Sequence, residues 1–375
     1  MSNRHVVVVA GEASGDQHAA ALVAQLRAMA PDLTFTGVGG RAMARAGVEL
    51  VFRAEELAVV GFTGVLSQAT RIIRALRGTR QHIASKRPEL VILVDFPDFN
   101  FRIGPAAKAA GAKVLYYIAP QVWAWRQGRA KAMGRFVDEL ACVLPFEPQF
   151  FARLCPQLKV SFVGHPLLDA PPPKVSLPVE ENHPVVALLP GSRHCELRHM
   201  LGPMVEAAGL MHAANPKLHF LLPLAPGITT EPYRHLLAQA PPTLHITPPV
   251  AQAVLARAQV AIVASGTATV QAAIAGVPTV VVYKTGWLNY QLARRLVKVP
   301  FIAMPNLIAG RRVLPELIQH ELTPQRLAAE AMRLLEDEEE RRRMQQGLAE
   351  VVAALGGPGA SKRAAEVALR LMEET

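Results

Sequence analysis

The sequence predicts an α/β protein made of two doubly wound parallel sheets. Short apolar, β-branched runs alternate with helical patterns along the chain, as in repeated βαβ units. A proline-rich, polar segment at 171–184 interrupts this alternation and has the composition of a linker. The alternation then begins again, and 375 residues are enough for two domains.

We expect a first domain at 1–170, a linker at 171–184, a second domain at 185–323 and terminal helices at 324–375. The expected strands of the first domain are 5–10, 33–37, 90–95, 113–118 and about 139–144. Its expected helices lie near 16–29, 62–84 and 103–110. The second domain is expected to have strands at 185–189, 218–222, 244–247, 260–264 and 279–283. Its helices should lie near 199–214, 231–239, 250–257, 268–275 and 287–297.

The segment 324–374 is helical in pattern and highly charged. Glu338 and Arg342, and likewise Glu339 and Arg343, are spaced as i,i+4 ion pairs on a solvated helix. The pattern is compatible with two packing partners for these helices: the first domain of their own chain or a second copy of the chain.

Composition excludes several classes of protein. The chain is 51% hydrophobic and 19% charged, which is unlike a disordered or fibrous sequence. Its three cysteines show no CxxC spacing, so we expect neither a disulfide framework nor a zinc site. The N-terminal apolar run is too short for a secretory signal, and no run reaches the length of a membrane span. These features predict a soluble protein of the cytoplasm.

Positive charge is concentrated in one part of the chain. The net charge is +10, and residues 71–135 hold 13 basic side chains against Glu89, Asp95 and Asp98. Such a patch favours nucleic acid, phospholipid headgroups or a phosphorylated substrate as ligand. Residues 57–80 combine an apolar helical face with a row of arginines, which is typical of a helix at a membrane interface or of one that packs on its own sheet. The residues expected to touch a membrane are Phe62, Val65, Leu66, Arg71, Arg74 and Arg77.

Acidic residues follow two strands of the first domain. Glu12 and Ser14 lie in the 11–16 turn (GEASGD), where glycines and a helix start suit an anion, although a plain turn capped by Ser14 or Asp16 explains half the motif. Asp95 closes a buried strand, which is where a base that takes a proton from a hydroxyl is expected. Asp98 can serve as this base, or it can cap the helix that is expected to begin near residue 103. The spacing of the two aspartates is not a D-x-D metal motif, so we expect no metal.

Two further segments predict ligand contacts. Trp123 and Trp125 lie beside Arg126 and Arg129, and together they can hold an acylated, phosphorylated sugar or simply anchor the loop. In the second half, two glycine turns follow strands and open helices, which suits a diphosphate that leaves without metal. The residues of these two turns are Gly191, Ser192, Arg193, Ser265, Gly266 and Thr267.

These segments, in this order, resemble the lipid-A-disaccharide synthase family. These are bacterial glycosyltransferases with the GT-B fold, in which two Rossmann-like domains face a cleft. The matching stretches span nearly the whole chain: 11–16, 95–100, 120–127, 144–147, 162–169, 188–193, 264–269 and 304–311.

The resemblance implies transfer from UDP-2,3-diacylglucosamine to 2,3-diacylglucosamine 1-phosphate (lipid X), which gives a β-1,6 disaccharide 1-phosphate and UDP. An α-linked donor and a β product imply inversion in one displacement, with Asp95 as base. The resemblance also places Asn306 and position 271 in the nucleotide site. It implies a protein at the cytoplasmic face of the inner membrane, with no cofactor and a homodimer through the terminal helices as an option.

Position 271 departs from the family. GT-B enzymes usually carry a glutamate there that accepts both ribose hydroxyls, whereas Gln271 offers one acceptor oxygen.

Two other interpretations of the sequence remain beside the resemblance. The first is another UDP-sugar enzyme of GT-B form, such as a peptidoglycan-precursor glycosyltransferase or a UDP-N-acetylglucosamine epimerase. The second is a nucleic-acid-binding protein, for which the chain shows positive charge but no recognition motif.

Overall fold

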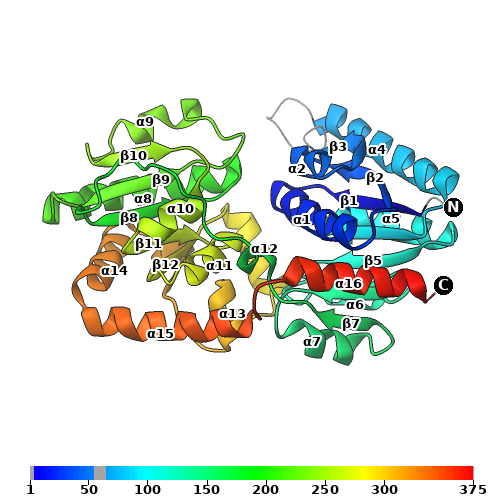
Figure 1. Ribbon diagram of the computed structural model, residues 1–375. Helices are drawn as coiled ribbons and strands as arrows, with labels where there is room; N and C mark the ends of the chain where they lie inside the picture. The colour runs from blue at the N-terminus through cyan, green and yellow to red at the C-terminus, as the bar shows by residue number, and fades with distance from the viewer. Residues whose placement is uncertain (1–3, 55–64, 375) are drawn as a thin grey trace. The chain divides into compact units, whose positions relative to one another are not determined.

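The computed structural model describes residues 4–54 and 65–374, with side chains of the 65–86 helix from residue 70 onward. The chain forms two compact units (Figure 1). Unit 1 comprises Met1–Asp169 and Leu355–Thr375, and unit 2 comprises Ala170–Ala354. The terminal helices expected at 324–375 are therefore divided between the units, because only the last of them belongs to unit 1.

Unit 1 contains a seven-stranded, fully parallel sheet in the order β3-β2-β1-β4-β5-β6-β7. Its strands are β1 (His5–Ala10), β2 (Thr34–Gly39), β3 (Glu49–Arg53), β4 (Leu90–Val94), β5 (Lys113–Tyr117), β6 (Glu139–Cys142) and β7 (Lys159–Phe162). The five expected strands are present, and the edge strands β3 and β7 are additional. Both added strands are only partly buried, so their sequences lack the continuous apolar run that marks an inner strand.

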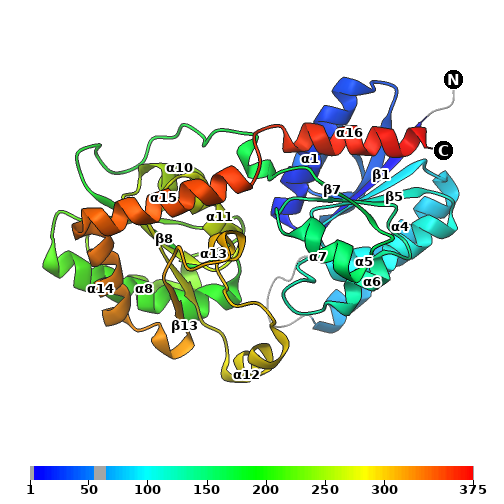
Figure 2. The ribbon, with the colours of Figure 1, turned by 90° about the horizontal axis from the view of Figure 1, so that it is seen from below.

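Helices cover both faces of this sheet. Figure 2 shows α1 and α16 on one face and α4 and α5 on the other. The helices of unit 1 are α1 (Ala13–Met29), α2 (Arg41–Arg45), α4 (Val65–Lys86), α5 (Pro97–Ala109), α6 (Gly128–Met133), α7 (Glu147–Leu154) and α16 (Ala360–Glu373). A 3-10 turn, Pro166–Leu168, ends the first segment. Because both faces are covered, every residue of β4 is 0% exposed, which explains its unbroken apolar sequence.

The final helix, α16, is tied to unit 1 at both ends. The Asp169 carboxylate accepts backbone N–H bonds from Gly359, Ala360 and Ser361 at 2.8–2.9 Å, so it satisfies the donors at the start of α16. Farther along, Arg370 pairs with the buried Glu139 of β6. In this chain the last helix therefore packs on its own first unit.

Unit 2 repeats the architecture with a six-stranded parallel sheet in the order β10-β9-β8-β11-β12-β13. Its strands are β8 (Val185–Leu189), β9 (His219–Pro223), β10 (Leu244–Thr247), β11 (Val260–Ala264), β12 (Thr279–Tyr283) and β13 (Glu316–Ile318). The edge strand β13 is additional to the five expected ones.

The helices of unit 2 are α8 (His194–Ala214), α9 (Arg234–Leu237), α10 (Ala251–Arg257), α11 (Thr267–Ile274), α12 (Trp287–Leu296), α13 (Met304–Ala309), α14 (Pro324–Glu336) and α15 (Glu338–Ala354). Two 3-10 turns lie at Glu231–Tyr233 and Gln319–Glu321. Alternate residues of β8 enter opposite core layers: Val186 and Leu188 pack with residues of α8 and α14, and Val185 and Ala187 with residues of α10 and α11. The two-residue period of a strand thus supplies both cores.

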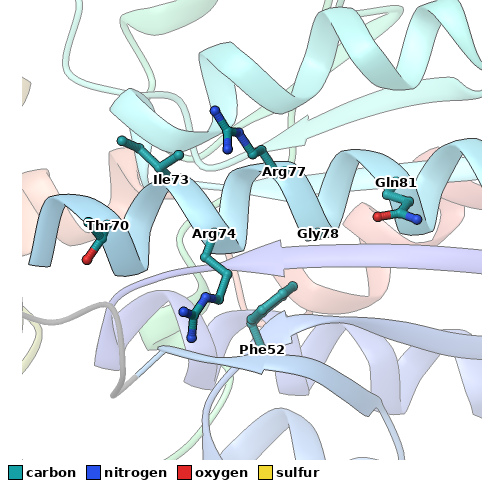
Figure 3. A pocket seen from close by; sticks show the side chains of 7 residues that line it. All are labelled: Phe52, Thr70, Ile73, Arg74, Arg77, Gly78 and Gln81. Atoms are coloured by element: carbon teal, nitrogen blue, oxygen red, sulfur yellow. The ribbon is translucent and has the colours of Figure 1, made fainter. Parts of the chain in front are cut away.

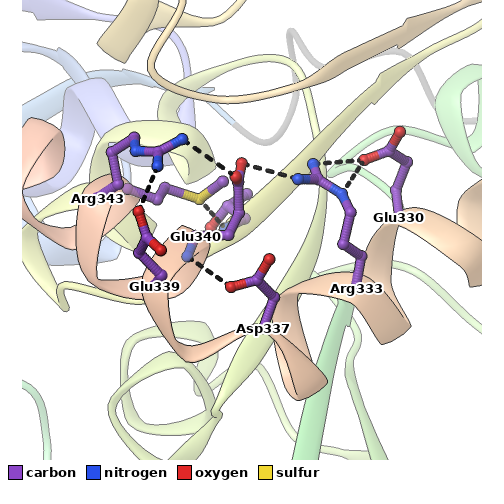
Figure 4. Close-up of polar contacts among 8 residues, drawn as sticks. Glu330, Arg333, Asp337, Glu339, Glu340 and Arg343 are labelled. Atoms are coloured by element: carbon purple, nitrogen blue, oxygen red, sulfur yellow. Dashed lines mark hydrogen bonds and ion pairs between the residues drawn. The ribbon is translucent and has the colours of Figure 1, made fainter.

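Ion pairs join α14 and α15 at the surface, as Figure 4 shows. Arg333 bridges Glu330 and Glu340 at 2.8 and 2.9 Å, and Asp337 accepts from the backbone N–H of Glu340. The expected i,i+4 pairs Glu338–Arg342 and Glu339–Arg343 are confirmed, at 2.6 and 2.9 Å. All of these side chains lie in solvent at least in part, so each pair contributes little stability alone.

Candidate active site at the strand ends of each unit

In each unit the sequence motifs meet where the strand order reverses. In unit 1 the chain runs outward from β1 through β2 and β3, then returns to β4 on the other side of β1. In unit 2 the same reversal separates β8 from β11. Ala10 is registered with Val94, and Leu189 with Val263, so the loops that follow these residues are neighbours. Open α/β sheets bind ligands at this point, outside the carboxyl ends of the strands.

Asp95 occupies the reversal point of unit 1 in a left-handed backbone conformation, with φ 44°. Its carbonyl oxygen accepts from the Tyr116 hydroxyl at 2.6 Å and from Asn100 Nδ2 at 2.7 Å. Its N–H donates to the Tyr117 carbonyl at 3.2 Å. The backbone of Asp95 is therefore held from three sides while the residue stays partly exposed. Such conformations cost about 1–3 kcal/mol and persist only where neighbours enforce them.

Gly11 connects the two acidic motifs of unit 1. A Cβ at Gly11 would lie 2.3 Å from the ring of Phe96, which itself has φ 45° and precedes α5. Only a glycine leaves room for this ring beside the end of β1. The turn after β1 and the turn after β4 are thus fitted to each other.

The residues of the 11–16 turn have separate roles. Helix α1 begins at Ala13, so Glu12 is its N-cap position and not, as expected, Ser14 or Asp16. Glu12 is exposed and Ser14 partly exposed, which leaves both within reach of a ligand. Asp16 is 7% exposed, and its carboxylate accepts backbone N–H bonds from Gly40, Ala42 and Met43 at 2.7–3.1 Å. Asp16 therefore fixes the start of α2.

Asp98 lies in the first turn of α5, which begins at Pro97 and not near 103, so the expected cap at 103 is corrected. Its carboxylate accepts from Arg129 Nη2 at 2.6 Å and lies 3.6 Å from Arg126 Nη1. The hydrogen bond from Arg129 lowers the pKa of Asp98 below its usual value. This keeps Asp98 ionised and places it to orient the two arginines.

The two tryptophans of the 119–127 loop differ. Trp123 is 5% exposed, and its Nε1–H donates to Glu147 Oε1 at 3.2 Å. It anchors the loop, which corrects its expected contact with the acceptor. Trp125 is 42% exposed, with the Arg126 guanidinium 4.0 Å from its ring centroid. Burial raises the pKa of Glu147 to about 7, against the lowering effect of its hydrogen bonds.

In unit 2, the 191–193 turn opens α8. Gly191 has φ 122°, and a Cβ there would lie 2.4 Å from the Glu196 carboxylate. This carboxylate accepts from the N–H groups of Ser192 at 2.7 Å and Arg193 at 3.2 Å. The turn's own backbone donors are thus partly engaged, and the Arg193 guanidinium, 58% exposed, is its main cationic group.

The 265–267 turn opens α11 at the neighbouring strand end. Gly266 has φ 151°, and nothing lies within 4 Å of a Cβ built there, so backbone conformation and not crowding requires glycine. The Ser265 hydroxyl donates to the Ile302 carbonyl at 2.7 Å, and Thr267 is exposed at the helix start. Gln271 lies one turn into α11, partly exposed.

The expected contact between Asn306 and the nucleotide is corrected by its burial. It is 0% exposed, and its side chain makes four hydrogen bonds: its amide nitrogen donates to the Leu314 carbonyl and Glu316 Oε1, and its oxygen accepts from the Val313 and Leu314 N–H groups. These four bonds use its whole capacity. Asn306 therefore shapes the 302–316 region from within and is not placed to contact a nucleotide. Glu316, which sequence reasoning missed, assists by accepting from the Ile302 and Ala303 N–H groups.

The basic helix α4 presents Ile73, Arg71, Arg74 and Arg77 to solvent, while Ala75, Leu76 and Ile83 pack inward. Phe62 and the side chains of Val65 and Leu66 lie outside the described residues. A pocket of about 610 Å³ is lined by Phe52, Thr70, Ile73, Arg74, Arg77, Gly78 and Gln81 (Figure 3). The helix thus combines one buried face with one exposed, cationic face.

Comparison with known proteins decides the family. A family model described as lipid-A-disaccharide synthetase matches residues 6–371. The chain belongs to this family. Lipid-A-disaccharide synthase of Myxococcus xanthus (strain DK1622) is 44% identical over 374 residues, covering 98% of this chain and 97% of the relative. The enzyme of Nitrosococcus oceani is 42% identical over 379 residues, with coverage of 98% and 96%. The protein is therefore a glycosyltransferase of lipid A biosynthesis that forms a lipid A disaccharide.

Solved structures agree with this family's GT-B architecture. A UDP-N-acetylglucosamine 2-epimerase matches with a TM-score of 0.67 at 15% identity, covering 100% of this chain and 98% of that one. The glycosyltransferase of kitacinnamycin also has a TM-score of 0.67, at 18% identity, covering 99% and 100%. At these identities the likeness shows the fold: two parallel-sheet, Rossmann-like domains of GT-B type.

The described residues also lack two features. No helix among them is long and apolar enough to cross a bilayer. Within residues 4–54 and 65–374, no group of three or more His, Cys, Asp or Glu residues is placed to hold a metal ion. The loop-shaping residues Glu147 and Glu316 were missed because a buried carboxylate has no signature in a single sequence.

Proposed function

We propose that the enzyme transfers 2,3-diacylglucosamine from its UDP conjugate to 2,3-diacylglucosamine 1-phosphate, with inversion at the anomeric carbon. Membership of the lipid-A-disaccharide synthase family supports this substrate pair. The observation that carries the mechanism is Asp95, a carboxylate held at the reversal point of unit 1 in a left-handed conformation. A residue other than glycine is tolerated there only at a cost in strain, which favours a role for its side chain.

In the proposed step, Asp95 accepts the proton of the acceptor's 6-hydroxyl as that oxygen attacks the anomeric carbon of the donor. The new C–O bond forms as the bond to the β-phosphate oxygen breaks, and the electron pair leaves with UDP. One displacement inverts an α-linked donor to a β product. A single base is sufficient for this reaction.

Unit 2 is proposed to bind the UDP moiety. The Arg193 guanidinium and the start of α11 at Ser265–Thr267 lie on adjacent strand ends, where they can neutralise charge that develops on the diphosphate. Gln271, one turn farther along α11, is proposed to contact the ribose.

Unit 1 is proposed to bind the acceptor. The residues proposed for this role are Ser14, Trp125 and the arginine pair held by Asp98, all of them at least partly exposed. Arginine is well suited to a phosphate because its planar fork donates two parallel hydrogen bonds. Glu12 is proposed to contact the acceptor hydroxyls, since it is the exposed carboxylate of the neighbouring strand end.

The exposed side of α4 is proposed to hold unit 1 at the cytoplasmic face of the inner membrane of a Gram-negative bacterium. Arg71, Arg74 and Arg77 supply the charge that anionic headgroups attract, and Ile73 is 46% exposed between them.

We further propose that any homodimer forms through the C-terminal helices. Sedimentation of the full chain with and without Arg342→Glu/Arg343→Glu tests this, and equal sedimentation with a dimer present would place the dimer contact elsewhere.

The test of the proposed reaction is product formation from both lipids in detergent micelles, with a chelator present. Wild type should form the β-linked disaccharide and UDP, and Asp95→Asn should not. Asp32→Asn is the matched control, because it removes an exposed carboxylate of the same unit that pairs with Arg4 and lies outside the proposed site. Loss of activity with Asp98→Asn but not with Asp95→Asn would transfer the base to another residue. A folded wild type that forms no disaccharide from this pair would overturn the proposed substrates.

A further inference from the structure

Helix α12 of unit 2 exposes an apolar surface that the proposed reaction does not use. None of its ten residues, all of them described, is buried. The side chains of Trp287, Leu288 and Leu292 are 69%, 74% and 58% exposed, values normally seen for charged residues. Figure 2 shows α12 at the end of a loop, away from the strands of its unit.

The exposed leucines form one stripe. Leu288, Leu292 and Leu296 are spaced at i, i+4 and i+8, so they follow one another along the same side of the helix. Trp287 begins the helix, and the exposed Val297 follows it. An apolar stripe on a short helix normally faces a core, but this one faces away from the core of unit 2.

The charge around this stripe is of one sign. Arg294, Arg295 and Lys298 are exposed in or directly after α12, and Lys284 precedes it. The sequence contains no aspartate or glutamate between Glu231 and Glu316. A stretch of this length without an acid is not explained by the ribose or diphosphate sites, which need only a few cations.

We infer that α12 is a membrane-docking helix, with the anionic headgroup layer of a bilayer as its partner. Leucines and a tryptophan suit the boundary between headgroups and acyl chains, and flanking Arg and Lys side chains can reach the phosphates. Charge complementarity favours this partner over a second copy of the chain, because two α12 segments would bring like charges together. The inference concerns unit 2 and is separate from the proposed contact of α4 in unit 1.

A membrane contact in each unit has a consequence for lipid handling. Under the proposed function both substrates carry acyl chains, so both units must approach the same lipid phase. Docking through α12 would keep the donor-binding unit at the surface where its substrate resides. This consequence rests on the proposed function, but contact between α12 and lipid does not.

The first experiment uses Trp287 as a reporter in the full-length protein. Its emission, taken as the difference between wild type and Trp287→Phe, is measured with vesicles of brominated phosphatidylcholine, with and without phosphatidylglycerol. We expect quenching by the brominated chains in the vesicles that contain phosphatidylglycerol. No lipid quenching of Trp287 would overturn the inference.

The second experiment measures vesicle binding in an Arg71→Gln/Arg74→Gln/Arg77→Gln background, so that α4 does not mask the effect. Leu288→Gln/Leu292→Gln/Leu296→Gln should weaken binding at least about tenfold. Leu210→Gln/Ile246→Gln is the apolar control, since both residues are 43% exposed elsewhere in unit 2. Arg294→Gln/Arg295→Gln/Lys298→Gln should weaken binding roughly fivefold per cation, or about a hundredfold. Lys174→Gln/Lys217→Gln/Lys362→Gln is the charge control, because it removes the same number of positive charges outside α12.

Two other occupants of the stripe give distinct results. Shielding of Trp287 from acrylamide that grows with protein concentration, without vesicles, would assign the stripe to a second copy. Shielding independent of concentration would assign it to another part of the chain. Either result overturns membrane docking. Because these measurements contain no sugar substrate, they are independent of whether disaccharide forms in micelles.

Discussion

The two strand-reversal points of the molecule use opposite means to turn the backbone. In unit 1 the left-handed residues at the reversal point are Asp95 and Phe96, which follow β4 and both carry side chains. In unit 2 the residues with positive φ at the reversal point are glycines, Gly191 after β8 and Gly266 after β11. The two units thus share a topology, but the positive-φ positions are occupied by strained non-glycine residues in unit 1 and by glycines in unit 2.

The difference follows from what each site must supply. Under the proposed function a base needs a side chain at a fixed point, which accounts for Asp95 in unit 1 despite the unfavourable conformation. Recognition of a diphosphate needs backbone N–H groups and open space, and glycine supplies both.

The largest expected effect is at Asp95. Asp95→Asn should lower kcat about 10²–10⁴-fold, the usual contribution of a general base. Asp95→Gly should abolish turnover as well, yet leave the protein equally stable or more stable by up to about 1 kcal/mol, because glycine relieves the left-handed strain. Turnover and thermal unfolding measure the two effects. A Asp95→Gly protein that unfolds more easily than wild type would contradict the claim of strain at this position.

Glycine substitutions in unit 2 test the other side of the contrast. Gly266→Ala should cost about 1–3 kcal/mol in stability or UDP binding, since φ 151° is unfavourable for an L residue. Gly191→Ala should cost more, because its Cβ also meets the Glu196 carboxylate. Gly209→Ala in α8, where a Cβ has open space, should be neutral or stabilising by up to about 1 kcal/mol. Scanning calorimetry measures the stability and titration calorimetry the affinity for UDP. Equal effects at Gly266 and Gly209 would contradict the claim that the backbone conformation at Gly266 requires glycine.

Arg193 tests the charge of the donor site. Arg193→Ala should raise the donor KM and lower kcat together, by roughly 10–100-fold in kcat/KM, as expected for a charge-assisted contact that strengthens as UDP leaves. Arg234→Ala, an exposed arginine of the same unit paired with Glu231, is the control. An unchanged donor profile in Arg193→Ala would exclude it from the diphosphate site.

Acid should affect unit 1 through two histidines, the buried His165 and the half-buried His18. Burial lowers the pKa of His165 to about 3 and that of His18 to about 4, below the usual 6.5. The unfolded chain binds these protons first, so the stability they contribute is complete above pH 6.5 and is lost as pH falls toward 3–4. At pH 5 the loss at His165 is about 2 kcal/mol. His165→Asn retains an acceptor for the Leu167 N–H and should flatten the decline in melting temperature from pH 7 to 5. An equally steep decline would show that His165 is protonated in the folded protein.

The smallest effect is expected at Gln271. Gln271→Glu restores a second acceptor oxygen and should bind UDP as tightly as wild type or by about 0.5–1.5 kcal/mol more tightly. Titration calorimetry with UDP measures this directly. Clearly weaker binding would show that the surroundings of position 271 are adapted to the amide.

The central strands of both sheets could be predicted because burial on two faces leaves an unbroken apolar run. This holds for β1 and β4, and for β8 and β11, which are also the strands that position the site. The edge strands β3, β7 and β13 were missed, since strands paired on one side need no such run, whereas the edge strand β10 was predicted.

The site could be predicted as a set of loops but not as a set of exposed side chains. Spacing placed Asp95 and Glu12 at strand ends, and the register confirms that their loops are adjacent. Spacing does not tell whether a polar side chain turns outward or inward. Trp123 and Asn306 turn inward because each meets a buried partner in a later element, Glu147 and Glu316 respectively.

The return of α16 to unit 1 bears on how the protein is made. A ribosome releases residues 1–169 long before residues 355–375, so unit 1 lacks one of its covering helices until all of unit 2 has been synthesised. During that interval the apolar surface later covered by Val367, Leu371 and Met372 is open to other molecules in the cell. The first unit to emerge is therefore the last to be complete, and deletion of the final helix should leave an aggregation-prone chain in which unit 2 still folds.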